Sequence, residues 1–387
     1  MTYPVLSVWW HLIVLALLPW LAYSYTLWHG GWVSDDHEGI EKFDGKLQRP
    51  ISFHNILKQI RWYIGRIHKE GKWAQVPRPH HRLSLYLGSG IGVLLYLFLS
   101  TLVSHEIAFI TTALFLIHPT GVQALGWISG IGYSLGFFFC MAAFNVAYLT
   151  TQCGWLTTPL GTMAALALFG VVQYAAIHAM FSTIGATFIL AFLGYWPFAI
   201  LTGVLACLGY ARTLKTAVEL RAKEFERQQM GACTKFYPRK VMVIFKTIAY
   251  YVALSIWPKS LGLFHVFNYH YELPKIELED TWFWAGVVLC IGMLSTFFWA
   301  PFPVQLAAVW FLAFLVTFFN WITANQFVSE RYGWYSSLAV CLIAASYLPV
   351  WVLMFVLGLS LMRTWVHLPT FDDALSFYQS NIFNYPN

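Results

Sequence analysis

The sequence predicts an all-α polytopic membrane protein with about ten or eleven transmembrane helices. Of its 387 residues, 59% are hydrophobic and 19% aromatic, whereas only 10% are charged. Soluble domains carry about 25% charged residues, so this composition excludes a disordered chain, a disulfide-rich scaffold and an ordinary cytosolic enzyme. In addition, many apolar stretches approach the roughly 20 residues that a spanning helix needs.

The charged residues gather in two islands. Sixteen lie between Trp28 and Arg82 and twelve between Arg212 and Lys246, while the 129 residues between Arg82 and Arg212 contain only Glu106 as a formal charge. The first island has ten basic and six acidic residues and the second nine and three. Since cytoplasmic loops are enriched in Lys and Arg, this favours a cytoplasmic second island and a translocated first one.

The net charge of +6 fits basic loops of a membrane protein. No basic run is interleaved with an aromatic platform, so nucleic acid is not an expected partner. The six cysteines show no CxxC spacing. They therefore indicate neither a disulfide framework nor a zinc site.

The predicted spans follow the apolar stretches along a transmembrane domain of residues 1–362. They are Val5–Leu27, Leu83–Val103, Ile107–Ile117, Leu125–Thr150, Val241–Leu263, Thr281–Ala300, Val304–Thr323 and Trp334–Leu361. The first has no basic start and no small-residue cleavage site, so we expect it to be retained. The short third span indicates a re-entrant turn at His118-Pro119. Residues 154–210 hold two long helices, or three shorter ones broken near Phe181–Ser182 and Trp196–Pro197.

The first outer loop, residues 28–82, is too long to be a mere connector. Within it, residues 51–68 place Phe53, Ile56, Ile60 and Ile64 at helical spacing, with lysine and arginine on the other side. This pattern predicts an amphipathic helix in the membrane interface. A core helix of a small extramembrane domain is the alternative.

Two adjacent carboxylates, Asp35 and Asp36, follow the first span. Such a pair serves as a general base, as metal ligands or simply as solvated loop charges. A carboxyl group near the low-dielectric interface can have its pKa raised into the range that a general base needs.

Three further polar motifs stand at expected membrane boundaries. They are Gln48-Arg49-Pro50, His118-Pro119 with Gln123, and Glu330-Arg331-Tyr332. An arginine at a membrane boundary can bind a lipid phosphate through its fork of donors.

Taken in order, these four motifs resemble the GT-C class of integral-membrane glycosyltransferases. They are most similar to the protein O-mannosyltransferases that carry tetratricopeptide repeats, and to their bacterial relatives. The resemblance extends from about Val33 to Leu338. It implies a GT-C-like fold and transfer, with inversion, of a sugar from a polyprenyl-phosphate carrier to a hydroxyl of a protein or glycan on the outer face. The short chain and abbreviated tail indicate a bacterial inner membrane.

The resemblance also implies residue roles. Asp35 is the general base and Asp36 supports it. The other roles are lipid-phosphate binding by Arg331 and Arg49, shaping of the second outer loop beside the acceptor by His118 and Gln123, and support by Glu330 and Tyr332. No cofactor is required when arginines neutralise the leaving group, although the aspartate pair offers ligands to a divalent metal.

The C-terminal tail, residues 363–387, contains Phe371–Tyr378, which resembles one helix of a tetratricopeptide unit. A single repeat cannot bury its own apolar face. A polar tail after the last span is the alternative interpretation.

Several positions depart from the family pattern. Relatives usually carry an Asn and a second His where this chain has Ser84 and Gly88, and often an acid where it has Gln123. The Lys-Glu often seen between positions 178 and 186 is absent. These departures favour an alternative, a non-catalytic GT-C-like membrane subunit that docks a membrane-protein partner. A third hypothesis is a lipid or glycan carrier without chemistry, such as a flippase.

Overall fold

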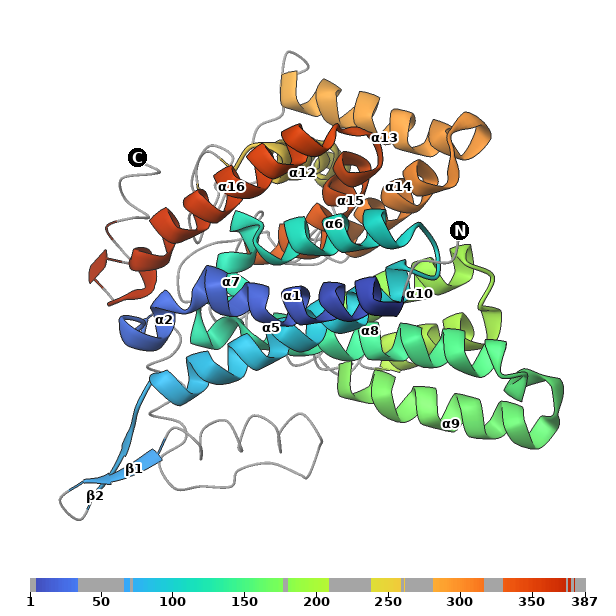
Figure 1. Cartoon of the computed structure of the whole chain (residues 1–387). Helices are drawn as coiled ribbons and strands as arrows, with labels where there is room; N and C mark the ends of the chain where they lie inside the picture. Colours follow the sequence, from blue (N-terminus) through green and yellow to red (C-terminus); the bar gives the residue numbers. More distant parts are fainter. Residues whose placement is uncertain are drawn as a thin grey trace.

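The computed structural model describes residues 5–33, 66–69, 72–176, 180–208, 238–258, 261, 281–316, 330–373, 375, 376 and 379. In this part the chain is a bundle of helices with one short two-stranded ribbon at its edge (Figure 1). The mainly helical fold predicted from the composition is therefore confirmed for the described residues.

The elements follow one another along the chain. They are α1 (Val5–Tyr23), α2 (Tyr25–Trp28), β1 (Arg66–Lys69), β2 (Lys72–Gln75), α5 (Arg78–Leu99), α6 (His105–Leu116), η1 (Pro119–Gly121), α7 (Val122–Leu125), η2 (Ile128–Gly130), α8 (Ile131–Gln152), η3 (Trp155–Thr157), α9 (Pro159–Ala176), α10 (Met180–Phe192), a helix at Trp196–Leu208, α12 (Pro238–Ile256), α13 (Thr281–Trp299), α14 (Phe302–Leu315), α15 (Glu330–Tyr347), α16 (Val350–His367) and η5 (Leu368–Phe371).

Several helices have the length and apolarity of membrane spans. Among the described residues, four stretches qualify: Arg78–Leu99, Ile128–Gln152, Thr281–Trp299 and Val350–Phe371. A fifth forms if α6 and the segment Pro119–Leu125, which bend by 55° at their junction, count as one broken span. Six shorter apolar helices accompany them. The chain is thus a membrane protein with several apolar helices, and the total of ten or eleven spans stays a prediction.

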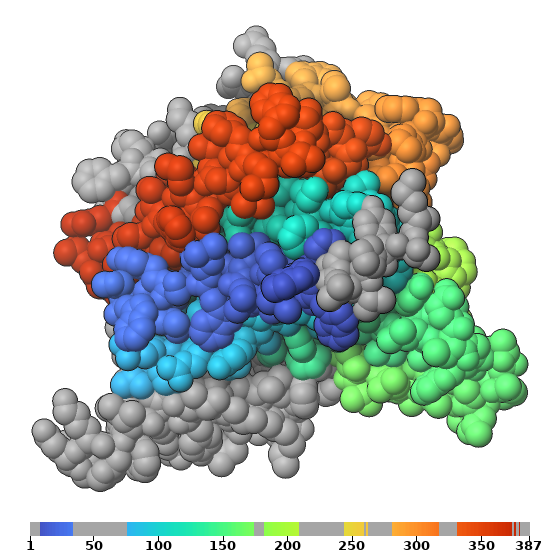
Figure 2. Space-filling model, in the orientation of Figure 1, coloured from blue at the N-terminus to red at the C-terminus, as the bar shows by residue number. Residues whose placement is uncertain are grey.

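The long helices occupy different depths in the bundle. The apolar stretches that contain α5 and α8 are 56% and 50% buried, respectively. Those that contain α13 and α16 are only 17% buried. The exposed residues of the outer helices are large and apolar, as at Phe298 and Trp351. Exposed apolar surface on this scale is unfavourable in water, so these faces suit lipid. Figure 2 shows α16 beside α1 on one such face, where the Trp365 indole N–H donates to the Leu21 carbonyl oxygen (3.3 Å).

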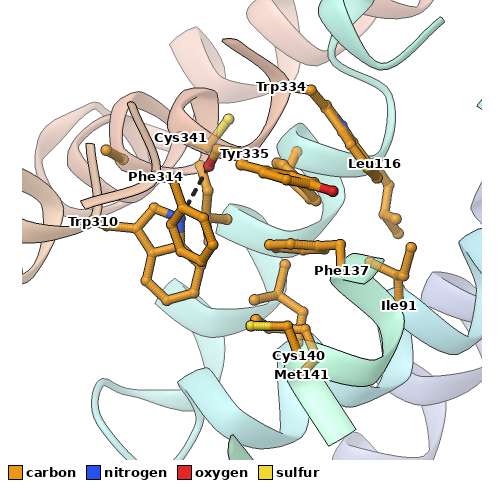
Figure 3. Packing of buried hydrophobic residues seen from close by; sticks show 14 of the residues in the cluster. Ile91, Leu116, Phe137, Cys140, Met141, Trp310, Phe314, Trp334, Tyr335 and Cys341 are labelled. Atoms are coloured by element: carbon orange, nitrogen blue, oxygen red, sulfur yellow. Dashed lines mark hydrogen bonds between the residues drawn. The ribbon is translucent and has the colours of Figure 1, made fainter. Parts of the chain in front are cut away.

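The centre of the bundle is a cluster of aromatic rings (Figure 3). Phe137 of α8 stacks on Tyr335 of α15 with ring centroids 5.0 Å apart, and Trp334 stacks on Phe115 of α6 at the same separation. The Trp310 indole N–H donates to the Tyr335 carbonyl oxygen at 3.0 Å. Stacked and edge-on rings add about 0.5–1.5 kcal/mol per pair beyond their buried area. This cluster therefore fixes the first half of α15 within the bundle.

Two predicted segments divide where the sequence contains a helix-breaking signal. The stretch Trp334–Leu361, predicted as one span, is two helices, α15 and α16. Pro349 lies at their junction as the N-cap of α16, and its ring cannot continue the preceding helix. The stretch 154–210 forms three helices in its described part, as one of the two alternatives had it, and Gly194 adopts a left-handed φ of 80° at the second break.

The prediction of an interfacial helix over residues 51–68 is wrong at its end. Residues 51–65 lie outside the described part, but Arg66–Lys69 forms strand β1, antiparallel to β2, with Ile67 opposite Ala74. A strand partner only a few residues downstream satisfies the backbone groups here through cross-strand hydrogen bonds. The helical spacing of the apolar residues does not extend through this hairpin.

Candidate functional site

The predicted first outer loop spans residues 28–82, and we call residues 30–33, near its start, the loop root. Its backbone is bonded at two points: the Gly31 amide donates to the Phe371 carbonyl oxygen (3.1 Å), and the Val33 carbonyl oxygen accepts from the Trp127 indole N–H (3.3 Å). Between them, the Trp32 ring meets the His80 ring edge to face at 5.3 Å. The loop root therefore has a defined position against α5, the turn before η2 and the C-terminal segment.

Close approach at the loop root depends on its two glycines. A Cβ added at Gly30 would lie 2.6 Å from the His81 ring nitrogen Nε2 and from the Thr26 carbonyl oxygen. A Cβ added at Gly31 would overlap the Asp372 carbonyl oxygen. Because only glycine leaves this space empty, the chain can leave α2 while packed against both α5 and the C-terminal segment.

Arg331 lies in the first turn of α15 and is only 8% exposed. Its guanidinium carbon lies 5.1 Å from the ring centroid of Trp127, 5.3 Å from that of Tyr332 and 5.7 Å from that of Tyr133. A buried cation is costly without partners, and these rings offset part of that cost through cation–π attraction.

Trp127 brings Arg331 and the loop root together. One edge of its indole is bonded to Val33, and its ring lies against the Arg331 guanidinium. Asp35, the predicted base, comes two residues after Val33 in the sequence. It therefore follows a segment that the Trp127 side chain connects to Arg331. Asp35, Asp36 and Arg49 themselves lie outside the described residues. In Figure 1 the corresponding end of the bundle is on the left, where α2, α7 and the end of α16 meet.

His118 has a structural place in this region. Its Nδ1 accepts from the Thr120 amide (3.3 Å) and lies 2.7 Å from the Thr120 hydroxyl oxygen, while its Nε2 lies 2.9 Å from the Ser255 carbonyl oxygen. A carbonyl oxygen only accepts, so Nε2 carries the proton and the imidazole is the neutral Nε2–H tautomer. His118 thus joins the turn after α6 to the end of α12. The 55° bend there confirms a turn at His118-Pro119, whereas the re-entrant character of that turn stays a prediction.

The remaining predicted site residues surround Arg331. Gln123 is buried, and its Oε1 accepts from the Arg331 backbone amide at 3.4 Å. Tyr332 contributes one of the rings near the guanidinium. Glu330 begins α15, and its side chain lies outside the described part.

A polar contact beside the loop root was not predicted from the sequence. The Tyr25 hydroxyl donates to Asp372 Oδ2 at 2.7 Å, and the Tyr25 ring stacks on His29 at 4.4 Å. This hydrogen bond to Asp372, together with desolvation, raises the pKa of Tyr25 to about 12. Burial raises the pKa of Asp372 above its ordinary value. The adjacent acids Asp372-Asp373 were visible in the sequence, but nothing local indicated their partner.

Just after this contact, Asp373 makes a helix-capping hydrogen bond in the C-terminal segment. Asp373 Oδ1 accepts from the Ser376 amide at 2.8 Å, as an N-cap carboxylate does at the start of a helix. Residues 375, 376 and 379 are helical. The resemblance of the tail to a tetratricopeptide helix stays a prediction, because residues 374, 377, 378 and 380–387 lie outside the described part.

Ser84 and Gly88, where the sequence differs from the family that it resembles, both lie in packed parts of α5. Ser84 is buried and its hydroxyl donates to the His80 carbonyl oxygen (3.4 Å). At Gly88, an added Cβ would lie 3.0 Å from the ring of Pro19 in α1. Position 88 is therefore a close contact between α5 and α1.

Within the described ranges, no three His, Cys, Asp or Glu side chains form a group able to hold a metal ion. The thiols of Cys140, Cys153, Cys207, Cys290 and Cys341 are free. No family model, curated protein or solved structure matches the chain.

Proposed function

We propose that the protein is a GT-C-like integral-membrane glycosyltransferase with ten or eleven spans, which uses a polyprenyl-phosphate sugar as donor. It works on the outer face of a bacterial inner membrane and glycosylates a hydroxyl of a protein or glycan. In the reaction, the acceptor oxygen attacks the anomeric carbon from the side opposite the phosphate. The new carbon–oxygen bond forms as the bond to phosphate breaks, so the configuration inverts. Asp35 takes the hydroxyl proton, and the polyprenyl phosphate leaves with the bonding electrons.

The observation that carries the proposal is the connection from Arg331 through Trp127 to Val33. The transfer needs a base near the acceptor and a cation near the departing phosphate, within one site. Arg331 supplies a cation at the start of α15. Trp127 connects this cation to the loop root, which lies just before Asp35 and Asp36 in the sequence. A cation held in place before the reaction stabilises charge that develops on the leaving group without reorganising first.

The surroundings of Arg331 support the same role. Three aromatic rings lie close to its guanidinium group, and such contacts preserve the positive charge while restricting the side chain. Guanidinium also binds phosphate in a planar, two-pronged geometry that the lysine ammonium cannot reproduce. In this proposal Asp36 and Arg49 complete the site, with Gln123, Tyr332 and Glu330 supporting Arg331.

The role of Asp35 as the base is tested in proteoliposomes. The assay measures transfer from a panel of radiolabelled polyprenyl-phosphate hexoses to endogenous or added hydroxyl acceptors. We expect transfer by the parent and a loss of about 10²–10⁴-fold in Asp35→Asn, the usual contribution of a general base. Asp44→Asn, a change of the same kind in the same loop, is the control and should leave transfer unchanged. Equal transfer by the parent and Asp35→Asn would overturn the assignment of the base.

The arginine is tested by Arg331→Lys, which keeps the charge and removes the planar fork. We expect this variant to lose transfer by about 10–100-fold, because a bidentate phosphate contact is lost. Arg82→Lys, in α5, is the matched control. If both lysine variants transfer as the parent does, Arg331 does not bind the leaving phosphate.

A second candidate, a non-catalytic membrane subunit, is favoured by the packing at Gly88 and Ser84. A side chain at position 88 would press on Pro19, so α5 packs closely on α1 at the position where the family that the sequence resembles carries a histidine. Purification in mild detergent discriminates the two functions. A stoichiometric membrane-protein partner together with no transfer from any donor would favour the subunit, whereas transfer by the isolated protein would exclude it.

A further inference from the structure

We propose that Trp127 is a positioning residue that couples the arginine at the leaving phosphate to the loop that carries the base. This inference rests on the proposed function and assigns a role to a residue outside the predicted motif positions. Trp127 itself is not expected to touch the reacting atoms.

The two chemically distinct parts of the indole serve two different partners. The N–H at its edge donates to the Val33 carbonyl oxygen (3.3 Å), and its ring lies 5.1 Å from the Arg331 guanidinium carbon. The side chain is 2% exposed, so water does not compete for either contact. A shift of Arg331 therefore acts on the ring that also holds the carbonyl group of Val33.

The turn that carries Trp127 is closely packed. At Gly126, an added Cβ would lie 2.8 Å from the Val122 carbonyl oxygen, and at Gly130 it would overlap the carbonyl oxygen of Gln123. The Gln123 side chain in turn accepts from the Arg331 amide. The turn from Gln123 to Gly130 is thus held against α15 through backbone and side chain, and Trp127 extends that contact to the loop root.

Such a connection matters because group transfer is sensitive to small displacements. A shift of about 1 Å in a catalytic group can reduce the rate by about 100-fold. Removing the indole N–H while keeping an aromatic ring should free Val33 and leave Arg331 in place. The expected result is a fall in kcat, counted per folded protein, with little change in KM for the donor. Counting per folded protein is necessary because general destabilisation also lowers the apparent kcat at an unchanged KM.

The experiment compares Trp127→Phe with Trp365→Phe in the full chain. Both tryptophans donate an indole N–H to a backbone carbonyl oxygen at 3.3 Å, but the partner of Trp365 is Leu21 of α1, on the outer face of the bundle. We expect Trp127→Phe to lower kcat about 10–100-fold, with KM for the donor within about threefold of the parent. Trp365→Phe should change kcat by less than about threefold. Equal effects of the two variants on kcat would overturn the proposal.

A second readout is independent of activity. Ser34→Cys, next to Val33, is labelled with a membrane-impermeant maleimide, and the labelled peptide is quantified by mass spectrometry. We expect the labelling rate at position 34 to rise at least about threefold in Trp127→Phe and to stay unchanged in Trp365→Phe. An unchanged rate in both would show that Trp127 does not hold the loop root. If the parent transfers no sugar while the labelling difference is found, the proposed function fails and the coupling stands.

Discussion

The Tyr25 hydroxyl donates a hydrogen bond to Asp372 Oδ2 across 347 positions of sequence. Close by, the Gly31 amide donates to the Phe371 carbonyl oxygen. These two bonds attach the residues after α16 to α2 and to the loop root. The C-terminal segment, as far as Asp373, is therefore part of the structure around the candidate site.

Tyr25→Phe should loosen this attachment. A hydrogen bond of this kind contributes about 1 kcal/mol net, which corresponds to about a fivefold change in an equilibrium between attached and detached states. We expect hydrogen exchange at the Gly31 amide to accelerate by about that factor. Tyr86→Phe, which alters an exposed tyrosine of α5, is the control. Unchanged protection of Gly31 in Tyr25→Phe would contradict the prediction.

The same contact should be visible as a function of pH. Hydrogen bonding to Asp372 raises the pKa of Tyr25 from about 10 to about 12. Because the folded-state value is the higher one, the contact contributes stability that is fully present below pH 10 and is lost as pH rises through about 12. The phenolate absorbance of Tyr25→Phe is subtracted from that of the parent at each pH. The titration midpoint of this difference should lie near pH 12. In the Asp372→Ala background that midpoint should move toward 10, and an unmoved midpoint would exclude Asp372 as the cause.

His118→Ala should destabilise the fold. It removes the donor to the buried Ser255 carbonyl oxygen and the partner of Thr120, and a buried group left without its partner costs about 1–3 kcal/mol. Thermal unfolding in detergent should show a lower Tm. Ser255→Ala is the control, because the bond is made to the backbone of that residue. A normal Tm combined with loss of transfer would instead indicate a chemical role for His118.

Some of the fold could be predicted because the signals are local. Each long apolar stretch predicts a helix in lipid from its own composition, and Pro119 marks the bend after α6. Pro349 carried a similar signal, but the continuous apolar run from Trp334 to Leu361 concealed it. At Arg66–Lys69 the helical spacing of a few residues was outweighed by a strand partner that lies immediately downstream.

The site was less predictable because its contacts are not local. Arg331, Tyr332 and Gln123 were chosen by resemblance, and the structure brings these three together. The contact of Trp127 with Val33 and Arg331 joins three distant parts of the chain, and no pattern within any one of them indicates the others. The Tyr25–Asp372 bond escaped prediction for the same reason.

Two glycines of α13 allow a direct test of how closely α12 and α13 pack. At Gly286, an added Cβ would overlap the Phe245 carbonyl oxygen of α12, whereas at Gly292 it would meet nothing within 4 Å. Gly286→Ala must therefore push the two helices apart, and overpacking of this kind typically costs about 1–3 kcal/mol. Gly292→Ala should be neutral or stabilise by up to about 1 kcal/mol, because alanine is the better helix former. Unfolding by sodium dodecyl sulfate in mixed micelles measures both free energies. Equal stability of the two variants would mean that the α12 and α13 backbones do not meet at Gly286.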